Sequence, residues 1–559
     1  MIGAGRRREW RGMTRATPLL ALLACVLHGA SAVAGAHGSS LSPRIRDAVD
    51  LGRAAPAEGR HVVVGLALRD RPGLDAFLAE VTNPLSPRYR DFLTPEEVAA
   101  AFAPSPEAEH TVVAHLEVSG LVVTERFPNR MLVGAVGPSA AVERAFGVEL
   151  HDVMLDGVHH FAATSEPVLP ASVAAHVAGV LGLDDLAPVH SHVRARPAAM
   201  PRAAVGRNCC HLGPADVTGF YDVPAGADGS GETLVVAGVY RWRPRDLAAF
   251  DLQWGLPDLP PGSGQVCTGN ASEPGCRFNH KRSLEAALDV EYAHAMAPGA
   301  RVVSYMAASR SLADLAVAYD HIVTDDPGTV VVTSWGACEA DVAAAIQQVD
   351  DGIFASGSAM GQAWFAASGD NGSLDCRGDH SGHRELVSVD HPANSPHVVG
   401  VGGTTPACAG AFVPGDAACA GYGGETAWQD SGGGVSQLFG RPAFQAGCGL
   451  PEGTERLVPD VALEANPEPG NYMVTNGHWF IVGGTSAAVA MWGGLFADVI
   501  ERTGGAAPGP PGPRLYALCG TEAFHDVTMG SNGAYQAGPG YDAVTGLGSP
   551  DVAALAASY

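Results

Sequence analysis

The chain has 559 residues, which is enough for more than one folded unit, since domains usually hold about 100–200 residues. Hydrophobic residues make up 46% of it and charged residues only 17%, which excludes a largely disordered polymer. The 59 aspartates and glutamates exceed the 34 lysines and arginines, and the net charge of −25 argues against nucleic acid and anionic membranes as partners.

Residues 1–36 have the features of a secretory signal. Arginines between positions 6 and 15 precede the apolar run "PLLALLACVL", and Ala32-Val33-Ala34 then offers an A-x-A cleavage motif. The apolar run is shorter than the roughly 18–20 residues that a membrane span needs. A lipoprotein signal ending at Cys25 is the alternative. We therefore expect a secreted, extracellular protein.

Residues 37–188 are predicted to form a first unit. The stretch His61–Asp70 favours a strand, and "GLDAFLAEVTNP" favours a helix that ends before its final proline. Thr94 is placed to cap a second helix, with Pro95 at its first position and Glu97 completing a capping box. The strand "NRMLVGAVG" and the helix "SAAVERAFG" follow. This alternation predicts a small α+β sandwich.

Residues 189–207 are predicted to be a linker. The segment "VHSHVRARPAAMPRAAVGR" is rich in proline, alanine and arginine and has no acidic residue. Proteolytic nicking concentrates in flexible, exposed segments of this kind, so it is a candidate processing site. An ordinary interdomain linker would have the same composition.

From residue 208 to 559 the pattern becomes α/β. Apolar strands such as "ETLVVAGVY", "RVVSYMAA", "GTVVVTSWG" and "AWFAASGD" alternate with helical stretches such as "SLADLAVAYDHIVTD". This pattern predicts a parallel sheet covered by helices on both faces. Active sites in such folds gather at the carboxyl ends of the strands.

The cysteines suggest disulfides. Ten of the 11 lie beyond the signal, and an even set in an exported chain favours disulfide bonds. Cys267 with Cys276, and Cys408 with Cys419, are the closest pairs, whereas the adjacent Cys209-Cys210 must pair elsewhere or stay free. There is no C-x-x-C motif, which argues against a zinc ribbon.

Three stretches of the second unit could carry chemistry. In "SLEAALDVEYAHAMAPGA", Glu285 and Asp289 lie four residues apart on one face of a predicted helix, where their repulsion favours a shared proton. Asp370 follows the strand "WFAAS" in a tight turn. Ser486, in "VGGTSAAVAMWGG", stands at the start of a buried helix whose amino end would stabilise an oxyanion.

Each stretch also has a simpler explanation when it is taken alone. The carboxylate pair could be a solvated acidic surface. Asp370 could only form a turn, and Ser486 could only cap a core helix.

Taken together and in this order, the three stretches resemble the sedolisin family of serine-carboxyl peptidases. "TSWGACE", "VDHPANSPHVVGVGGTT" and "VPDVALEANP" add to the likeness, and "NPLSPRYRDFLTPEEVAAAFAPS" resembles the family's activation domain. The resemblance covers nearly all of the chain after the signal. It implies a subtilisin-like parallel sheet flanked by helices, preceded by a ferredoxin-like α+β prodomain.

The resemblance also implies roles for these residues. Ser486 would be the nucleophile, and Glu285 would be the general base that takes its proton. Asp289 would hold Glu285 and share the proton. Asp370 would be a protonated carboxyl that donates a hydrogen bond to the oxyanion, together with the backbone N–H of Ser486. A carboxylate base, with a pKa below that of histidine, suits catalysis in acid.

The carboxyl-terminal loop "HDVTMGSNGAYQAGPGYDAVTGLGSPD" predicts a calcium site. Its carboxylates and free carbonyls are hard oxygen ligands of the kind that calcium prefers. The resemblance to the family's calcium loop implies one ion, held by the side chains of Asp526 and Asp542 and by the carbonyls of Val527, Gly538 and Gly540. A plain surface loop is the alternative.

The sequence departs from the family pattern in two places. Ala490 stands where the family commonly has proline, and Tyr240 stands where some members place a glutamate that extends the proton network. Trp335 matches the tryptophan of that network. Loss of the outer glutamate could alter the pH optimum without abolishing activity.

We expect a self-processing zymogen that becomes a secreted, acid-acting endopeptidase. It would be a monomer that acts on proteins or peptides, with its prodomain as intramolecular inhibitor and chaperone. A tripeptidyl-peptidase of the same family and a non-catalytic secreted binding protein are the alternatives. A Ser-His-Asp protease is a further rival, but the only His-Gly pairs, at His28 and His37, lie in or just after the signal.

Overall fold

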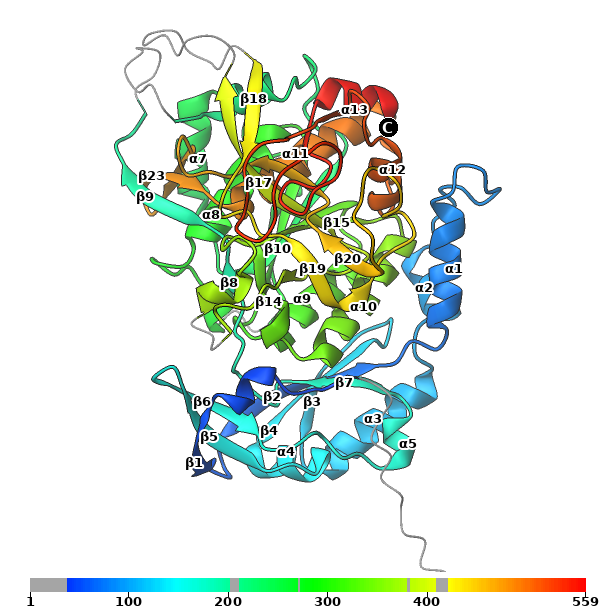
Figure 1. Cartoon of the computed structure of the whole chain (residues 1–559). Helices are drawn as coiled ribbons and strands as arrows, with labels where there is room; N and C mark the ends of the chain where they lie inside the picture. The colour runs from blue at the N-terminus through cyan, green and yellow to red at the C-terminus, as the bar shows by residue number, and fades with distance from the viewer. Residues whose placement is uncertain (1–37, 202–210, 270–271, 380–382, 409–420) are drawn as a thin grey trace, which may run out of the picture.

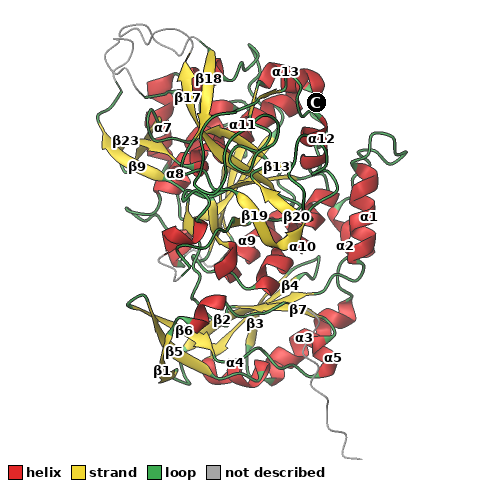
Figure 2. Ribbon diagram, viewed as in Figure 1, coloured by secondary structure: helices red, strands yellow, loops and turns green. Residues whose placement is uncertain are grey.

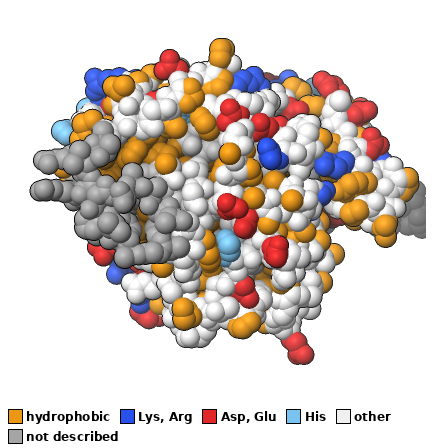
Figure 3. Space-filling model, turned by 90° about the horizontal axis from the view of Figure 1, so that it is seen from above, with side chains coloured by type: hydrophobic (Ala, Val, Ile, Leu, Met, Phe, Trp, Pro, Cys, Tyr) orange, Lys and Arg blue, Asp and Glu red, His pale blue; other side chains and the backbone are white. Residues whose placement is uncertain are grey.

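The computed structural model describes residues 38–201, 211–269, 272–379, 383–408 and 421–559, in a smaller and a larger unit (Figure 1). The expected signal at 1–36 lies outside the described residues, as do Cys209, Cys210 and Cys419. No helix within the described ranges is long and apolar enough to cross a bilayer. Acidic side chains are spread over the face shown in Figure 3, so the negative charge is not gathered in one patch there.

The first unit is built on a four-stranded antiparallel sheet in the order β3-β4-β2-β7. The chain runs β2, α3, β3, β4, α4, β7, which is the predicted ferredoxin-like arrangement. A second sheet has the order β1-β5-β6. The strands of this unit are β1 Val49–Arg53, β2 Gly59–Leu66, β3 Val122–Arg126, β4 Leu132–Pro138, β5 Leu150–Leu155, β6 Val158–Ala163 and β7 Val177–Leu181. Its helices are η1 Pro43–Arg46, α1 Arg71–Val81, α2 Pro95–Ala101, α3 Pro106–Val118, α4 Ser139–Phe146 and α5 Ala171–Ala174.

Helix caps explain where α1 and α2 begin. The predicted capping box of α2 is confirmed, because Thr94 accepts from the backbone N–H of Glu97 while the Glu97 side chain accepts from that of Thr94. Helix α1 begins two residues before the predicted start, because the Asp70 side chain accepts from the N–H of Gly73.

The second unit contains an eight-stranded sheet, and its parallel core confirms the predicted subtilisin-like architecture. The strand order is β11-β12-β10-β13-β15-β17-β18, with β21 also paired to β17. All of these pairs are parallel except β17 with β18. The strands are β10 Thr233–Val239, β11 Gly264–Cys267, β12 Arg301–Ala307, β13 Val330–Thr333, β15 Ala363–Ala367, β17 Val399–Cys408, β18 Tyr422–Ala427 and β21 Val461–Glu464.

Helices cover both faces of this sheet (Figure 2). Successive strand residues point to opposite faces, so Val332 packs with α8 and α11 while Val331 packs with α9 and α10. The near-continuous apolar strands of the sequence follow from this burial on two sides. The helices of this unit are α6 Pro214–Phe220, α7 Pro244–Trp254, α8 Leu284–Met296, α9 Leu312–Asp325, α10 Ala344–Ala359, α11 Thr485–Arg502, α12 Gly512–Ala517 and α13 Val552–Ser558, with short 3₁₀ turns at η2 Pro274–Cys276, η3 Glu339–Asp341 and η4 Asp375–Asp379.

The two units share an apolar interface. The sheet of the first unit packs on α10, closely enough that a Cβ added to Gly179 would lie 3.0 Å from the Cβ of Ala345. Helices α1 and α2 extend along the side of the larger unit (Figure 1), where Arg71 pairs with Asp351 at 2.8 Å. The first unit is therefore docked on the second through both apolar and charged contacts.

Part of the predicted linker forms strands. Within 189–207, residues 190–191 form strand β8 and residues 194–198 form strand β9, and both pair with strands of the larger unit. The sequence did not predict these strands because their partners come from distant parts of the chain. The remaining strands are β8 His190–Ser191, β9 Arg194–Ala198, β14 Trp335–Cys338, β16 Asp390–His391, β19 Gly434–Gly440, β20 Glu455–Val458, β22 Asn471–Thr475, β23 His478–Gly483, β24 Phe524–His525 and β25 Ser549–Pro550.

Three disulfides lie among the described residues. The predicted Cys267–Cys276 bond is confirmed. Cys338 bonds to Cys376 and Cys448 bonds to Cys519, two pairs that sequence spacing alone did not indicate. The predicted bond between Cys408 and Cys419 involves a residue outside the described ranges.

Candidate active site

Helix α8 carries Glu285 and Asp289 into the interior of the larger unit. Each side chain is about 1% exposed, so a solvated acidic surface is ruled out. The Ser334 hydroxyl, directly after β13, donates to Oδ1 of Asp289 at 2.6 Å. The carboxylate pair therefore lies at the carboxyl end of a central strand, where the fold was expected to place functional groups.

Ser486 is the second residue of α11, which packs directly against α8. The serine is fully buried, and its side chain contacts Glu285 and lowers the pKa of that carboxyl. Gly484 caps the helix with φ +105°, a conformation that favours glycine. Two helices that pack together thus bring the expected nucleophile to the expected base.

Burial dominates the titration of the carboxylate pair. It raises the pKa of Glu285 well above its usual value, and the neighbouring Asp289 raises it further. Burial also raises the pKa of Asp289, although the hydrogen bond from Ser334 opposes this. The low pKa expected for the base, Glu285, is therefore not found in the uncut chain, where this carboxyl is buried. Two buried carboxyls in contact tend to share one proton, as expected.

Asp370 follows β15 and lies beside the start of α11. Its Oδ1 accepts from the backbone N–H of Thr485 at 2.8 Å and from the Thr485 hydroxyl at 3.0 Å. Burial raises the pKa of Asp370, while His192, Thr485 and Arg194 oppose the rise. The structure thus brings Asp370 to the same helix end as Ser486.

Residues 190–198 cross this site in an extended conformation. On one side of Ser486, β8 pairs antiparallel with β14, so that Ser191 lies opposite Trp335. On the other side, β9 pairs antiparallel with β23, so that Arg194 lies opposite Gly483. A segment held by backbone pairing on both sides of a nucleophile has the position of a bound peptide.

The carbonyl group of His192 lies at the amino end of α11. The backbone N–H of Ser486 donates to this carbonyl oxygen at 3.1 Å. A Cβ added to Gly484 would lie 2.2 Å from the same oxygen and 2.6 Å from Oδ2 of Asp370. The carbonyl oxygen and the Asp370 carboxyl therefore border one small space over Gly484.

Tyr240, which departs from the family pattern, and Trp335, which matches it, lie beside Asp289. Trp335 and Tyr240 line a small cavity that Asp289 also borders, and their ring centroids are 5.9 Å apart. The Tyr240 hydroxyl accepts from Arg282 at 3.1 Å. Ala490 is buried inside α11, where a helix continues without interruption.

Histidines of the larger unit do not form a Ser-His-Asp triad in the part of the chain that the structure describes. His294 bonds to the carbonyl of Pro257 at 2.9 Å, and His383 bonds to Asp341 at 2.8 Å. Neither contacts Ser486.

The proposed calcium ligands converge on one loop. Oδ2 of Asp526 accepts from the N–H of Gly540 at 2.9 Å, and Oδ2 of Asp542 accepts from that of Gly538 at 3.0 Å. Burial raises the pKa of Asp542, and backbone N–H groups oppose this. Val527 is buried beside Asp526. An all-oxygen set with two carboxylates directed at one turn fits a hard cation.

Sequence reasoning missed three residues that lie at the site. Nε2 of His192 lies 3.3 Å from Oδ2 of Asp390, and the Ser334 hydroxyl donates a hydrogen bond to Asp289. Signals for them were present, since Ser334 lies in "TSWGACE", Asp390 lies in "VDHPANSP", and the segment reads His-Ser-His. Their roles depend on tertiary contacts that no local pattern reveals.

Comparisons with known proteins agree with this geometry. Residues 46–186 match the pro-kumamolisin activation domain. The chain is 30% identical to sedolisin from Pseudomonas sp. (strain 101), over 92% of this chain and 89% of that protein. It is 32% identical to kumamolisin from Bacillus sp. (strain MN-32), over 93% of this chain and 94% of that protein.

A solved structure is similar to the larger unit. Pseudomonas sedolisin, a serine-carboxyl proteinase complexed with two molecules of pseudo-iodotyrostatin, is 28% identical with a TM-score of 0.55, and the match covers 62% of this chain and 97% of that one. The chain therefore belongs to the sedolisin family and is a serine-type peptidase made as a zymogen with an N-terminal activation domain.

Proposed function

We propose that this chain is a secreted, acid-acting serine-carboxyl endopeptidase that removes its own prodomain. The observation that carries the proposal is the hydrogen bond from the N–H of Ser486 to the carbonyl oxygen of His192. It supports an oxyanion site at the amino end of α11, next to Asp370. The buried pair of Glu285 and Asp289 supports a carboxylate base in place of histidine.

In the proposed reaction, Ser486 Oγ attacks the carbonyl carbon of the peptide bond. Its proton passes to the ionised member of the Glu285–Asp289 pair, and the oxyanion accepts from the N–H of Ser486 and from the protonated Asp370. The C–N bond then breaks, and the pair returns the proton to the leaving amine. Water enters, loses a proton to the same pair and attacks the carbonyl carbon of the acyl-enzyme. The ester bond to Ser486 Oγ then breaks, the pair returns the proton to Oγ, and the acid product leaves.

Acid favours this arrangement because Asp370 must be protonated to donate. Burial already raises the pKa of Asp370, which extends its protonated form toward higher pH. The carboxylate pair must retain one negative charge to act as the base. Activity is therefore expected between the protonation of the pair at low pH and the loss of the Asp370 proton at higher pH.

The bond His192–Val193 is the proposed processing site. The His192 carbonyl lies at the oxyanion position, and the flanking residues pair with β14 and β23 as a substrate would. This bond lies within residues 189–207, where the sequence predicted processing. The prodomain thereby also acts as an intramolecular inhibitor, because its carboxyl end fills the cleft.

The test is self-cleavage after acidification of the full-length chain. We expect the wild type to shorten and to yield a fragment beginning at Val193, identified by mass spectrometry, while Ser486→Ala stays full length. The variant Glu285→Gln should be slower by orders of magnitude because it cannot accept the proton. If wild type and Ser486→Ala behave alike, the enzymatic proposal fails.

The path of the segment favours an endopeptidase over a tripeptidyl-peptidase. The chain continues before His190, where Val189 donates its N–H to the carbonyl of Arg310 at 2.9 Å, so at least a fourth residue is accommodated on that side of the bond. Cleavage of a denatured protein in acid, followed by mass spectrometry, tests this. Internal fragments of varied length support the endopeptidase, and release of tripeptides alone contradicts it.

We further propose that one calcium ion stabilises the carboxyl-terminal loop. Asp526, Asp542 and the carbonyls of Val527, Gly538 and Gly540 would hold it. The ion would neutralise the carboxylates and cross-link the loop, away from the reacting groups.

The signal-like residues 1–36 support secretion. Determining the amino terminus of the exported protein tests this: cleavage after Ala34 supports a secreted protein, and a lipid-modified Cys25 supports a lipoprotein.

A further inference from the structure

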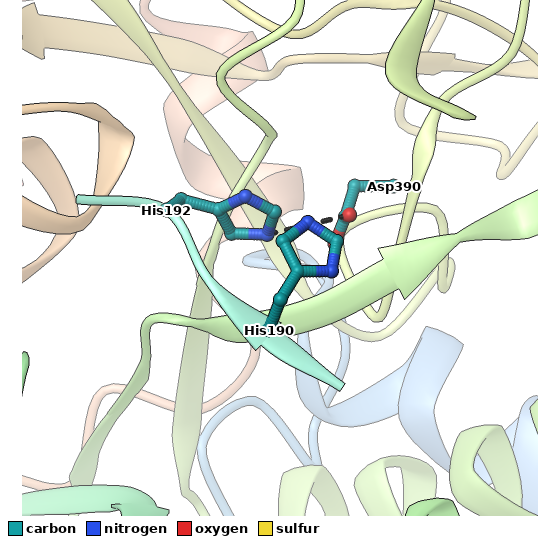
Figure 4. Close-up of side chains that lie close together, drawn as sticks. All are labelled: His190, His192 and Asp390. Atoms are coloured by element: carbon teal, nitrogen blue, oxygen red, sulfur yellow. Dashed lines mark ion pairs between the residues drawn. The ribbon is translucent and has the colours of Figure 1, made fainter. Parts of the chain in front are cut away.

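A cluster of metal-ligating side chains lies in the cleft outside the catalytic group. Strand β14 is the centre of a three-stranded sheet in the order β16-β14-β8. His190 lies opposite Gly336 on one side, and Asp390 lies opposite Cys338 on the other. Because residues two apart on a strand share a face, His190 and Asp390 lie on the same face of this sheet. His192, two residues after His190, completes the group (Figure 4).

Gly336 provides the space that lets these side chains meet. A Cβ added there would lie 1.9 Å from Oδ1 of Asp390. The carboxylate of Asp390 therefore extends across the backbone of β14 toward the histidines. In Figure 4 the two imidazole rings and this carboxylate face one another, and the ring centroids of His190 and His192 are 4.7 Å apart.

The buried carboxylate needs a positive charge. Asp390 is 0% exposed and neither of its oxygens accepts a hydrogen bond within the described residues. Oδ2 of Asp390 lies 3.3 Å from Nε2 of His192, which is 1% exposed and whose ring nitrogens likewise make no hydrogen bond within the described residues. A buried carboxylate is costly unless a cation or hydrogen-bond donors compensate it.

We propose that His190, His192 and Asp390 bind one divalent transition-metal ion, with zinc as the best match. Candidate ligand atoms of the three residues all lie within 4.8 Å of one another. The 3.3 Å between His192 Nε2 and Asp390 Oδ2 equals the edge of a tetrahedron with metal–ligand bonds of about 2.0 Å. Two imidazoles and one carboxylate suit zinc, whereas the all-oxygen loop at Asp542 suits calcium.

The metal site would join the two parts of the chain that processing separates. This link between the metal and processing rests on the proposed function. His190 and His192 precede the bond proposed to be cut, and Asp390 belongs to the peptidase unit. Cleavage would release both histidines with the prodomain and so remove two of the three ligands. A bound ion would hold the segment in the cleft and slow its replacement by other substrates. The metal site would thus exist in the uncut chain and regulate the same active site.

The direct test is a calorimetric titration of full-length Ser486→Ala with zinc chloride at pH 7, in excess calcium chloride. We expect one zinc ion per chain, and an affinity at least tenfold weaker in Asp390→Asn and in His190→Asn. His110→Asn, which changes an exposed histidine of α3, should bind zinc unchanged. Absence of binding, or equal binding by all four proteins, would overturn the proposal.

A second measurement guards against misfolding and adventitious binding. The metal-free variants should keep the thermal midpoint of the parent, and cobalt bound to the parent should give the intense visible absorption of a tetrahedral site. If either Asp390→Asn or His190→Asn unfolds, the zinc affinity of the other variant and the cobalt spectrum of the parent show whether the three residues bind the metal. A weak octahedral cobalt spectrum would count against the three-ligand site.

Processing provides a separate readout. Self-cleavage is measured at the highest pH at which the wild type still processes, because imidazoles bind zinc only when they are deprotonated. Micromolar zinc should slow self-cleavage there, and this effect should be lost in His190→Asn. If the wild type is never cut, with or without zinc, while Ser486→Ala binds zinc as expected, the proposed function fails and the metal site stands. If cleavage proceeds at an equal rate with zinc bound, the regulatory role is wrong.

Discussion

Asp370 is subject to two opposing influences within one site. Burial raises its pKa, which favours the neutral form that can donate to an oxyanion. Nε of Arg194 lies 3.6 Å from Oδ2 of Asp370, and this positive charge lowers the pKa. Arg194 belongs to the segment in the cleft, so the uncut chain itself stabilises the ionised, inactive form of Asp370.

Replacing Arg194 by glutamine should shift self-processing toward higher pH. Loss of the guanidinium raises the pKa of Asp370, so a larger fraction is protonated at a given pH. Because Arg194 is 46% exposed at its side chain, solvent screens the pair and the shift should be about one pH unit or less. The measurement is the rate of self-cleavage against pH. Arg196→Gln, on an exposed residue of the same strand, is the control. A shift to lower pH would contradict the argument.

At this scale the sequence indicated which residues meet. Glu285, Asp289, Asp370 and Ser486 were singled out from short patterns and the family resemblance, and the structure brings all four together, while their catalytic roles stay a prediction. The pKa of Glu285 was not predictable, because it depends on how completely neighbouring chain buries it. Asp390 was not predictable for a related reason, since it meets His192 only after β8 and β16 pair with β14.

The contact between α8 and α11 sets the distance from the nucleophile to its base. A Cβ added to Gly494 of α11 would lie 2.5 Å from the Cβ of Met296 on α8. Glycine at this position thus allows the two helices to approach closely, which carries Ser486 to Glu285. The helices act as one rigid support because both are almost wholly buried.

Gly494→Val should therefore lower both stability and turnover. Overpacking of this kind costs about 1–3 kcal/mol, and separation of the helices weakens proton transfer from Ser486. We expect a lower thermal midpoint and a lower kcat in the processed enzyme. Gly264→Ala is the matched control, because an added Cβ there meets no atom within 4 Å. Unchanged kcat in a stably folded Gly494→Val protein would show that this contact does not position the site.

The carboxyl-terminal loop gives a second test at the scale of an element. A ligand that binds only the folded state stabilises it by about 2.7 kcal/mol at a hundredfold excess over its dissociation constant. Chelation of calcium should therefore lower the thermal midpoint of the mature protein, and added calcium should restore it. Asp542→Asn should abolish the response. A midpoint that does not change on chelation would reject the calcium proposal.

Elements were predictable where local patterns dominate. The capping box of α2 and the apolar strands of the large sheet follow from short-range rules, and the structure confirms them. Strand β9 does not follow such rules. Its first four residues are exposed, and its arginine- and proline-rich sequence favours a loop. It is a strand because β23 supplies the partner.

The stability of one charged contact between the units depends on pH. His61 of the prodomain bonds to Asp314 of the peptidase unit at 2.9 Å, and despite partial burial this raises the pKa of His61 to about 10. The same contact lowers the pKa of Asp314. The pair stabilises the docked form at neutral pH and weakens once Asp314 is protonated in acid. Strong acid thus loosens this contact, whereas milder acid already favours the protonated form of Asp370.

Buried carboxyls with raised pKa values should make the whole proenzyme most stable in mild acid. Burial raises the pKa values of Glu464 and Asp498 to about 8. In the unfolded chain such groups titrate near pH 4, so between about pH 4 and 8 the folded state binds more protons. The free energy of unfolding therefore falls as pH rises through this range. Lowered groups such as Asp314 lose their contribution only in stronger acid.

The measurement is the thermal midpoint of full-length Ser486→Ala at constant ionic strength and calcium. We expect a higher midpoint at pH 5 than at pH 8, because deprotonation in the folded state forces charge into the core. Asp498→Asn keeps a neutral side chain at one of these positions, so it should reduce the difference between the two pH values. A midpoint that rises from pH 5 to pH 8 would contradict the assignment of these carboxyls as protonated groups. It would also remove the stability argument for a chain adapted to acid.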